Sequence, residues 1–194
     1  HARAPVDFSP RAVPKTKGHF DRDFVKFVNV PANARVNRKV LLDKNRIAMS
    51  LSESSPLNRV EGEGSVGIIT SGVSYNYVKE AVSGASILKL GFTNPLPEKT
   101  IVDFIKGKER IIVVEELDPF LEDGVMRICA QYGLFAPSYG KRSGHLPFAG
   151  EYSTDVLEGV KGLVRIKEFA EPLSMPDVNL PSRPPTLCAG CPHR

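Results

Sequence analysis

The sequence has few cysteines and no long apolar run. Its 194 residues include three cysteines, too few for a disulfide framework, which favours a reducing, cytoplasmic compartment. No stretch approaches the roughly 18 consecutive apolar residues of a membrane span, and no signal-peptide core lies near the start. The chain opens with His1 in place of an initiator methionine. These absences predict a cytoplasmic protein without membrane contact, and the start at His1 fits either a tag remnant or a chain excised from a longer one.

Charge is distributed unevenly along the chain. Residues 1–60 carry 12 Lys and Arg against 5 Asp and Glu, whereas residues 61–172 carry 12 against 16. A basic extension can bind nucleic acid, but these charges are dispersed and no aromatic ladder accompanies them. The pattern favours a basic extension that lies against the acidic domain or a neighbouring subunit. An α/β interaction module that uses this extension to bind an acidic partner or nucleic acid remains the alternative function.

The first 60 residues read as a linker followed by one helix. Residues 1–31 contain four prolines without a sustained period, which is typical of an extended linker. A helix is predicted between Pro31 and the stop signal Ser54-Ser55-Pro56. We expect its apolar stripe to dock on the domain that follows. The stripe consists of Val36, Val40, Leu41, Ile47, Ala48 and Leu51, and the opposite face of Arg35, Arg38, Lys39, Lys44 and Arg46.

From residue 64 onward, apolar strands alternate with amphipathic helices. Residues 66–70, 86–90 and 111–114 are short apolar runs typical of strands that are buried on both faces. A helix carrying Tyr77, Val78, Ala81 and Val82 follows the first strand, and we expect Ser74 to cap it. A second helix follows the second strand and is expected to end at Gly107. A third helix follows the third strand, and Asp118 is its expected cap. This order predicts an α/β fold with right-handed crossovers, in which helices cover both faces of a mostly parallel sheet as a three-layer sandwich.

The remaining elements of the domain are less distinct. A fourth strand is predicted near residues 135–141, a helix over residues 154–162 and an edge strand over residues 163–169. Prolines then return at five positions between 172 and 185, as in a linker. The predicted organisation is a linker with an amphipathic helix (1–60), an α/β domain (61–170) and a proline-rich linker leading into a further domain (171–194).

Several residues near the strand ends could carry chemistry. The loop 71–74 precedes a helix, where an anion can bind, but it matches neither common phosphate-binding glycine motif, so a structural turn is favoured. Glu115 and Glu116 follow the third strand, where open α/β sheets place ligands; helix capping or an interface role is favoured over acid–base chemistry. For Lys141, Arg142 and His145, in the glycine-rich loop 140–150, a solvated loop is favoured over an anion site.

The C-terminal residues hold the most specific motif. Cys188 and Cys191 are separated by two residues, a spacing that suits zinc, an iron–sulfur cluster or a redox dithiol. Proline-rich sequence precedes the pair, whereas a redox dithiol normally follows a strand and opens a helix, so half of a metal or cluster site is favoured. The third cysteine, Cys129, falls on the apolar stripe of the predicted helix that closes at Gly133 and is expected in the core.

Residues 184–194, which read PPTLCAGCPHR, resemble the opening of the thiamine-diphosphate-binding domain in the α subunit of indolepyruvate:ferredoxin oxidoreductases. Upstream stretches are similar to the same subunit in the same order. They are residues 6–11 (VDFSPR), 30–35 (VPANAR), 67–75 (GIITSGVSY), 90–97 (LGFTNPLP) and 113–117 (VVEEL). The resemblance therefore covers essentially the whole chain, and it implies a transketolase C-terminal-like domain with its two linkers.

The resemblance also implies an activity for the complete enzyme. Such enzymes oxidatively decarboxylate aryl pyruvates, consume coenzyme A and reduce ferredoxin, using thiamine diphosphate, Mg²⁺ and four-iron four-sulfur clusters. Cys188 and Cys191 match cluster ligands, and His193 matches a position close to the thiamine; Pro192 departs from the glycine common there. The implied partners are a β subunit, a second α subunit and ferredoxin. The chain itself is then a non-catalytic domain that orients its neighbours, inactive when isolated.

Overall fold

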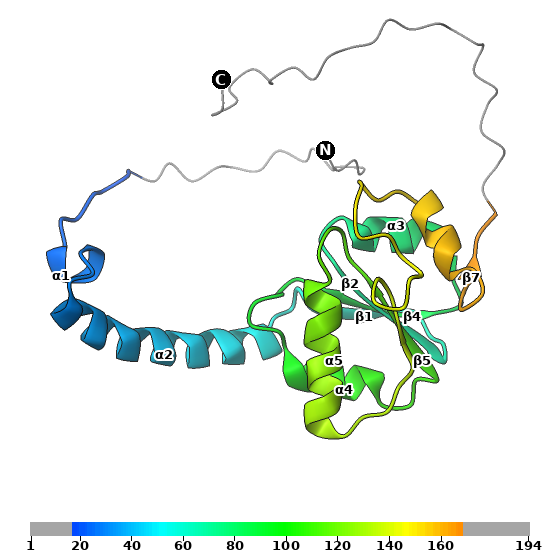
Figure 1. Cartoon of the computed structure of the whole chain (residues 1–194), viewed down its shortest axis with the longest axis horizontal. Coiled ribbons are helices and arrows are strands. Elements are labelled where there is room, and N and C mark those ends of the chain that lie inside the picture. Colours follow the sequence, from blue (N-terminus) through cyan, green and yellow to red (C-terminus); the bar gives the residue numbers. More distant parts are fainter. Residues whose placement is uncertain (1–16, 169–194) are drawn as a thin grey trace, which may run out of the picture.

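A computed structural model describes residues 17–168 and shows an α/β domain from which a helical arm projects (Figure 1). The arm consists of a short helix, α1 (Phe24–Phe27), and a long one, α2 (Pro31–Glu53). Pro31 occupies the first turn of α2, where its missing N–H costs no hydrogen bond. The long helix is confirmed, while α1 was not predicted: it is only four residues long, so it has no periodicity to detect.

The domain is built on one five-stranded sheet. Its strands are β1 (Arg59–Glu61), β2 (Val66–Ser71), β4 (Ser86–Leu90), β5 (Arg110–Val114) and β6 (Ser138–Tyr139), in the spatial order β1-β4-β2-β5-β6. Strands β4, β2, β5 and β6 are parallel, and β1 pairs antiparallel with β4. The three strongest strand predictions are confirmed as adjacent parallel strands. β1 was missed because it is short, polar and an edge strand.

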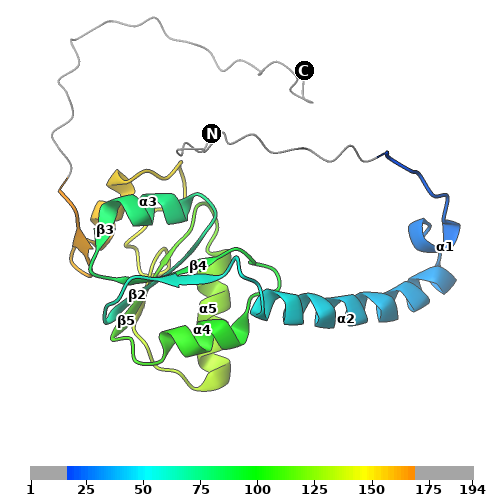
Figure 2. The same ribbon diagram turned by 180° about the vertical axis from the view of Figure 1, so that it is seen from behind.

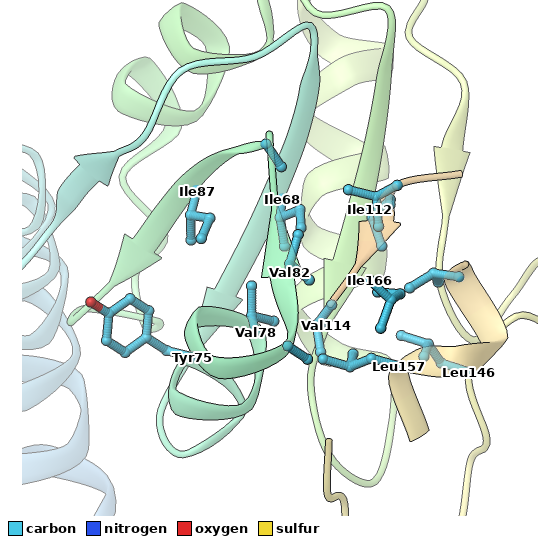
Figure 3. Close-up of a cluster of buried hydrophobic side chains, with 14 of the residues drawn as sticks. Ile68, Tyr75, Val78, Val82, Ile87, Ile112, Val114, Leu146, Leu157 and Ile166 are labelled. Atoms are coloured by element: carbon cyan, nitrogen blue, oxygen red, sulfur yellow. The ribbon is translucent and has the colours of Figure 1, made fainter. Parts of the chain in front are cut away.

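Helices cover both faces of this sheet, which gives the expected three layers (Figure 2). On one face lie α4 (Glu98–Ile105) and α5 (Phe120–Tyr132), packed on Ile69, Leu88, Ile111 and Val113. On the other lie α3 (Ser74–Ala81) and a 3₁₀ helix, η1 (Asp155–Val160). Figure 3 shows that second core, where Ile68, Ile87 and Ile112 of three neighbouring strands contact Val78, Leu146 and Leu157.

The expected boundaries need five corrections. Ser74 is the first residue of α3 and not its cap, and Val82 leaves the helix to join β3 (Val82–Ser83). Asp118 does not cap α5, whose N-cap position is Pro119 without a side-chain bond. Only a 3₁₀ helix forms in residues 154–162. The last strand, β7 (Arg165–Ile166), pairs with β3 in a separate two-stranded sheet instead of extending the main one.

The expected docking of α2 on the domain is also wrong. Val36, Val40 and Leu51 are all exposed, and Ile47 is 61% exposed. Only the last turn of the helix is attached: the buried Ser52 hydroxyl donates to the Pro95 carbonyl at 2.8 Å. An amphipathic pattern shows that one face is suited to burial but does not identify what buries it. The described part of the basic extension before this last turn therefore does not lie along the acidic domain.

Candidate functional site at the carboxyl edge of the sheet

The carboxyl ends of β2 and β5 form the switch point of the sheet. After β2 the chain continues into α3 on one face, and after β5 it continues into α5 on the other. Diverging connections leave an opening between two such strands, where ligands commonly bind in open α/β sheets. The sequence candidates Ser71, Glu115 and Glu116 lie here, and the loop after β6 adds Lys141.

The Glu115 side chain caps the N-terminus of helix α5. Its two carboxylate oxygens accept hydrogen bonds from the backbone N–H groups of Leu121 and Glu122, at 2.7 and 2.8 Å. These donors have no partner within the helix, so the carboxylate takes the role expected of Asp118. Burial raises the pKa of Glu115, and the two N–H groups oppose that shift. The favoured helix-capping role for one of the two glutamates is confirmed.

Glu122 and Lys141 bind the loop after β6 to α5. The Glu122 carboxylate accepts the backbone N–H of Lys141 at 2.9 Å, and both side chains are almost completely buried. A Cβ atom at Gly140 would lie 2.9 Å from this carboxylate, so glycine is needed for the approach. Glu122 was not singled out from sequence because a charged residue in the first turn of a helix is usually a solvated one.

The Lys141 ammonium group is held inside the loop that it begins. It donates to the Pro147 carbonyl at 2.6 Å and to the Tyr152 hydroxyl, which itself donates to Pro147 at 2.8 Å. Burial lowers the pKa of Lys141, and burial together with nearby carboxylates raises the pKa of Tyr152 to about 12. Glu116 closes the loop by accepting the Tyr152 backbone N–H at 3.0 Å. The favoured solvated position is wrong for Lys141.

Arg142 and His145 lie closer to the surface. Arg142 forms two hydrogen bonds to Asp123 on α5, at 2.8 and 2.9 Å, and both side chains are about half exposed. The Arg142 hydrogen bond lowers the pKa of Asp123. His145 contacts Ser143 through Nδ1 at 2.9 Å and lies edge-to-face with Tyr139. These contacts hold the loop in shape and do not converge on a common ligand position.

The carboxyl edge is thus a closed network. Within residues 17–168, no buried side-chain nitrogen or oxygen lacks a hydrogen-bond partner. In the same residues no cluster of three or more His, Cys, Asp or Glu side chains could hold a metal ion, and no helix is long and apolar enough to cross a membrane. Glu115, Glu122 and Lys141 form hydrogen bonds within the protein, so this arrangement stabilises the fold.

The predicted metal and cofactor residues Cys188, Cys191 and His193 lie outside the described residues. Cys129 is buried in α5, as expected from its stripe, and burial raises the pKa of its thiol. Thiolate is the reactive form of cysteine, so Cys129 should react slowly.

Thiol titration of the native chain is expected to count two fast cysteines, Cys188 and Cys191, and one slow one, Cys129. We expect Cys188 and Cys191 to react fast because two thiolates without further ligands should bind no metal. Denaturation should make all three fast. Three equally fast thiols in the native chain, or stoichiometric zinc or iron bound to it, would contradict this assignment.

Comparison with known proteins gives one consistent result, although no family model matches the chain. Indolepyruvate oxidoreductase subunit IorA of Methanothermobacter marburgensis is 39% identical over 202 residues, covering 100% of this chain and 32% of that subunit. The chain is related to the IorA subunits. IorA of Archaeoglobus fulgidus is 40% identical over 86% of the chain, and IorA of Thermococcus kodakarensis 34% over 91%, covering 28% and 29% of those subunits. The family resemblance is confirmed, and the chain spans about a third of the IorA subunits it matches.

Proposed function

We propose that the chain is one domain, with its linkers, of the α subunit of an indolepyruvate:ferredoxin oxidoreductase, and that this domain is a scaffold without catalytic residues. The observation that carries the proposal is the 39% identity to an IorA subunit over the entire chain. The closed network at the carboxyl edge supports the second part, because its ionisable groups are already engaged with one another.

In the complete enzyme, the reaction is the oxidative decarboxylation of aryl pyruvates such as indolepyruvate to aryl-acetyl-CoA, with electrons passed to ferredoxin. Bound thiamine diphosphate supplies the carbanion stabilisation that this reaction needs. Cys188 and Cys191 would contribute two thiolate ligands to a four-iron four-sulfur cluster, and His193 would lie near the thiamine. Its further partners are a β subunit and a second α subunit. The complete enzyme lies in the cytoplasm. Mg²⁺ and coenzyme A serve the complete enzyme only.

The role of this chain's described residues is to hold neighbouring parts of the subunit in a fixed orientation. Glu53, at the end of α2, accepts the backbone N–H groups of Lys99 and Thr100 at 2.7 and 3.1 Å and so caps α4. Asn58 accepts from the N–H of Gly91 and donates to the Ser52 carbonyl. These contacts fix the angle at which the arm leaves the domain, so the domain can transmit a defined orientation to whatever the arm binds.

The isolated chain is expected not to decarboxylate indolepyruvate, with or without added thiamine diphosphate and Mg²⁺. Its sequence contains neither of the common glycine-rich motifs that bind a diphosphate. The ionisable groups of the network at the carboxyl edge are already bonded to one another. The measurement is reduction of a viologen acceptor by purified chain, with the complete α and β subunits as the positive control. Turnover by the isolated chain above the uncatalysed rate would overturn the scaffold role.

A further inference from the structure

The helical arm, residues 17–53, is the largest feature that the domain does not use. Helix α2 has 23 residues and spans about 35 Å, and it leaves the domain after a single attached turn (Figures 1 and 2). At its far end, Asn33 and Asn37 donate to backbone carbonyls of Val28 and Val25, which fold α1 back on α2. The arm is therefore a defined helical hairpin, although it has almost no contact with the rest of the described chain.

The arm exposes most of the apolar surface that the described residues leave uncovered. Of the 21 large hydrophobic residues that are exposed, 13 lie between Phe20 and Leu51. Soluble monomers rarely expose a contiguous apolar face of this kind unless it binds something. Helices in proteins also take most of their stability from tertiary packing, which α2 has only at its last turn. Both considerations indicate that the arm is covered in the functional protein.

A groove at the base of the arm continues this apolar surface. Met49 of α2, Pro95 and Phe120 line a cavity of about 420 Å³ between the arm and the start of α5. A second cavity, of about 690 Å³, adjoins it along α2 and shares Met49 and Pro95. Charged groups of both signs border the apolar floor: Arg127, Glu98 and Asp123 line the first cavity, and Arg46 and Glu53 line the second. A partner could contact the arm and the domain together in the angle between them.

We propose that the arm and this groove bind the part of the same subunit polypeptide that lies outside this chain. The inference rests on the proposed function. The chain covers 32% of its Methanothermobacter relative, so about two thirds of such a subunit remains to supply the covering surface. A covalently attached domain has an effective concentration in the millimolar range, which favours it over a free molecule.

Charge indicates the chemistry of the covering surface. Between residues 35 and 46 the arm carries five basic side chains and one acidic one, Asp43. A second copy of the arm would bring like charges together, which is unfavourable. The complementary surface is apolar with acidic side chains at its rim, where they can meet the exposed Arg35, Arg38 and Lys44 of the arm. The geometry therefore favours a flanking domain of this chemistry over self-association of two arms.

The test compares the same helix in two contexts by hydrogen–deuterium exchange. In the complete subunit, amides of residues 34–53 should exchange at least about tenfold more slowly than in the 194-residue chain. Ile47→Glu should restore fast exchange in the complete subunit, because it places a charge on the covered face. The same substitution should leave the melting temperature of the 194-residue chain unchanged, because Ile47 is exposed there. Phe135→Glu, at a fully exposed site off the arm, is the matched control and should alter neither measurement.

Equal exchange in the two contexts would overturn the proposal. So would protection in the 194-residue chain that increases with protein concentration, since a second copy would then cover the arm. Activity separates this inference from the proposed function: a complete enzyme that oxidises indolepyruvate while α2 exchanges freely would remove only the docking surface.

Discussion

Ile112→Asp is expected to unfold the α/β domain. Ile112 is completely buried at the centre of β5, where it is in register with Ile68 of β2 (Figure 3). On its other side it is in register with Tyr139 of β6. An aspartate there would be an unpaired charge in the middle of a sheet, at a cost of several kcal/mol against a typical total stability of about 5–15 kcal/mol. Circular dichroism during a thermal or urea melt measures the effect.

The matched control for this substitution is Phe135→Asp, which introduces the same charge at a side chain that is 100% exposed. Its melting temperature should stay close to that of the unaltered protein. A cooperative transition of Ile112→Asp at the same temperature as the control would show that β5 is not a buried strand of the core.

Lys141→Met is expected to destabilise the domain by about 2–4 kcal/mol. The substitution retains much of the apolar stem but removes the ammonium group, which leaves the Pro147 carbonyl and the Tyr152 hydroxyl without their buried donor. It also removes a positive charge that interacts with Glu115 and Glu122. Urea unfolding gives the free energy, and limited proteolysis should show earlier cleavage within residues 140–152.

Arg142→Met is the control for the loss of a cation from the same loop. Arg142 pairs with Asp123 at the surface, and exposed ion pairs contribute about 0–1 kcal/mol. The account requires the Lys141 variant to lose clearly more stability than the Arg142 variant. Equal losses would mean that Lys141 is solvated, as its glycine-rich surroundings suggest from sequence alone.

The sequence was sufficient for the features that depend on local patterns. The runs 66–70, 86–90 and 111–114 are uniformly apolar because their strands are buried on both faces, so their parallel pairing could be predicted. Helix capping by one of the two glutamates after β5 could be predicted, because a carboxylate that follows a strand lies close to the N-terminus of the next helix. Cys129 was placed correctly because helical periodicity alone determines its face.

Features that depend on distant contacts could not be predicted in the same way. Lys141 and Tyr152 lie in a stretch rich in glycine and polar residues, and only the closure of the loop on Glu122 buries them. The predicted docking of α2 was wrong for the opposite reason. The apolar stripe of the helix is clear from sequence, but a stripe does not identify the domain that covers it. Strand β7 was predicted at the right place but assigned to the wrong sheet, since two residues carry no information on their partner.

The scaffold role is tested most directly by turnover in the complete enzyme carrying substitutions at the carboxyl edge. Glu116→Gln and Asp118→Asn remove ionisable groups that follow β5, while Glu115 and its cap remain. General acid–base catalysis contributes about 10²–10⁴-fold to a rate. Without such a role, kcat for indolepyruvate-dependent viologen reduction should stay within about twofold of the unaltered enzyme. A loss of about a hundredfold or more in either folded variant would contradict the account and make this edge part of the active site.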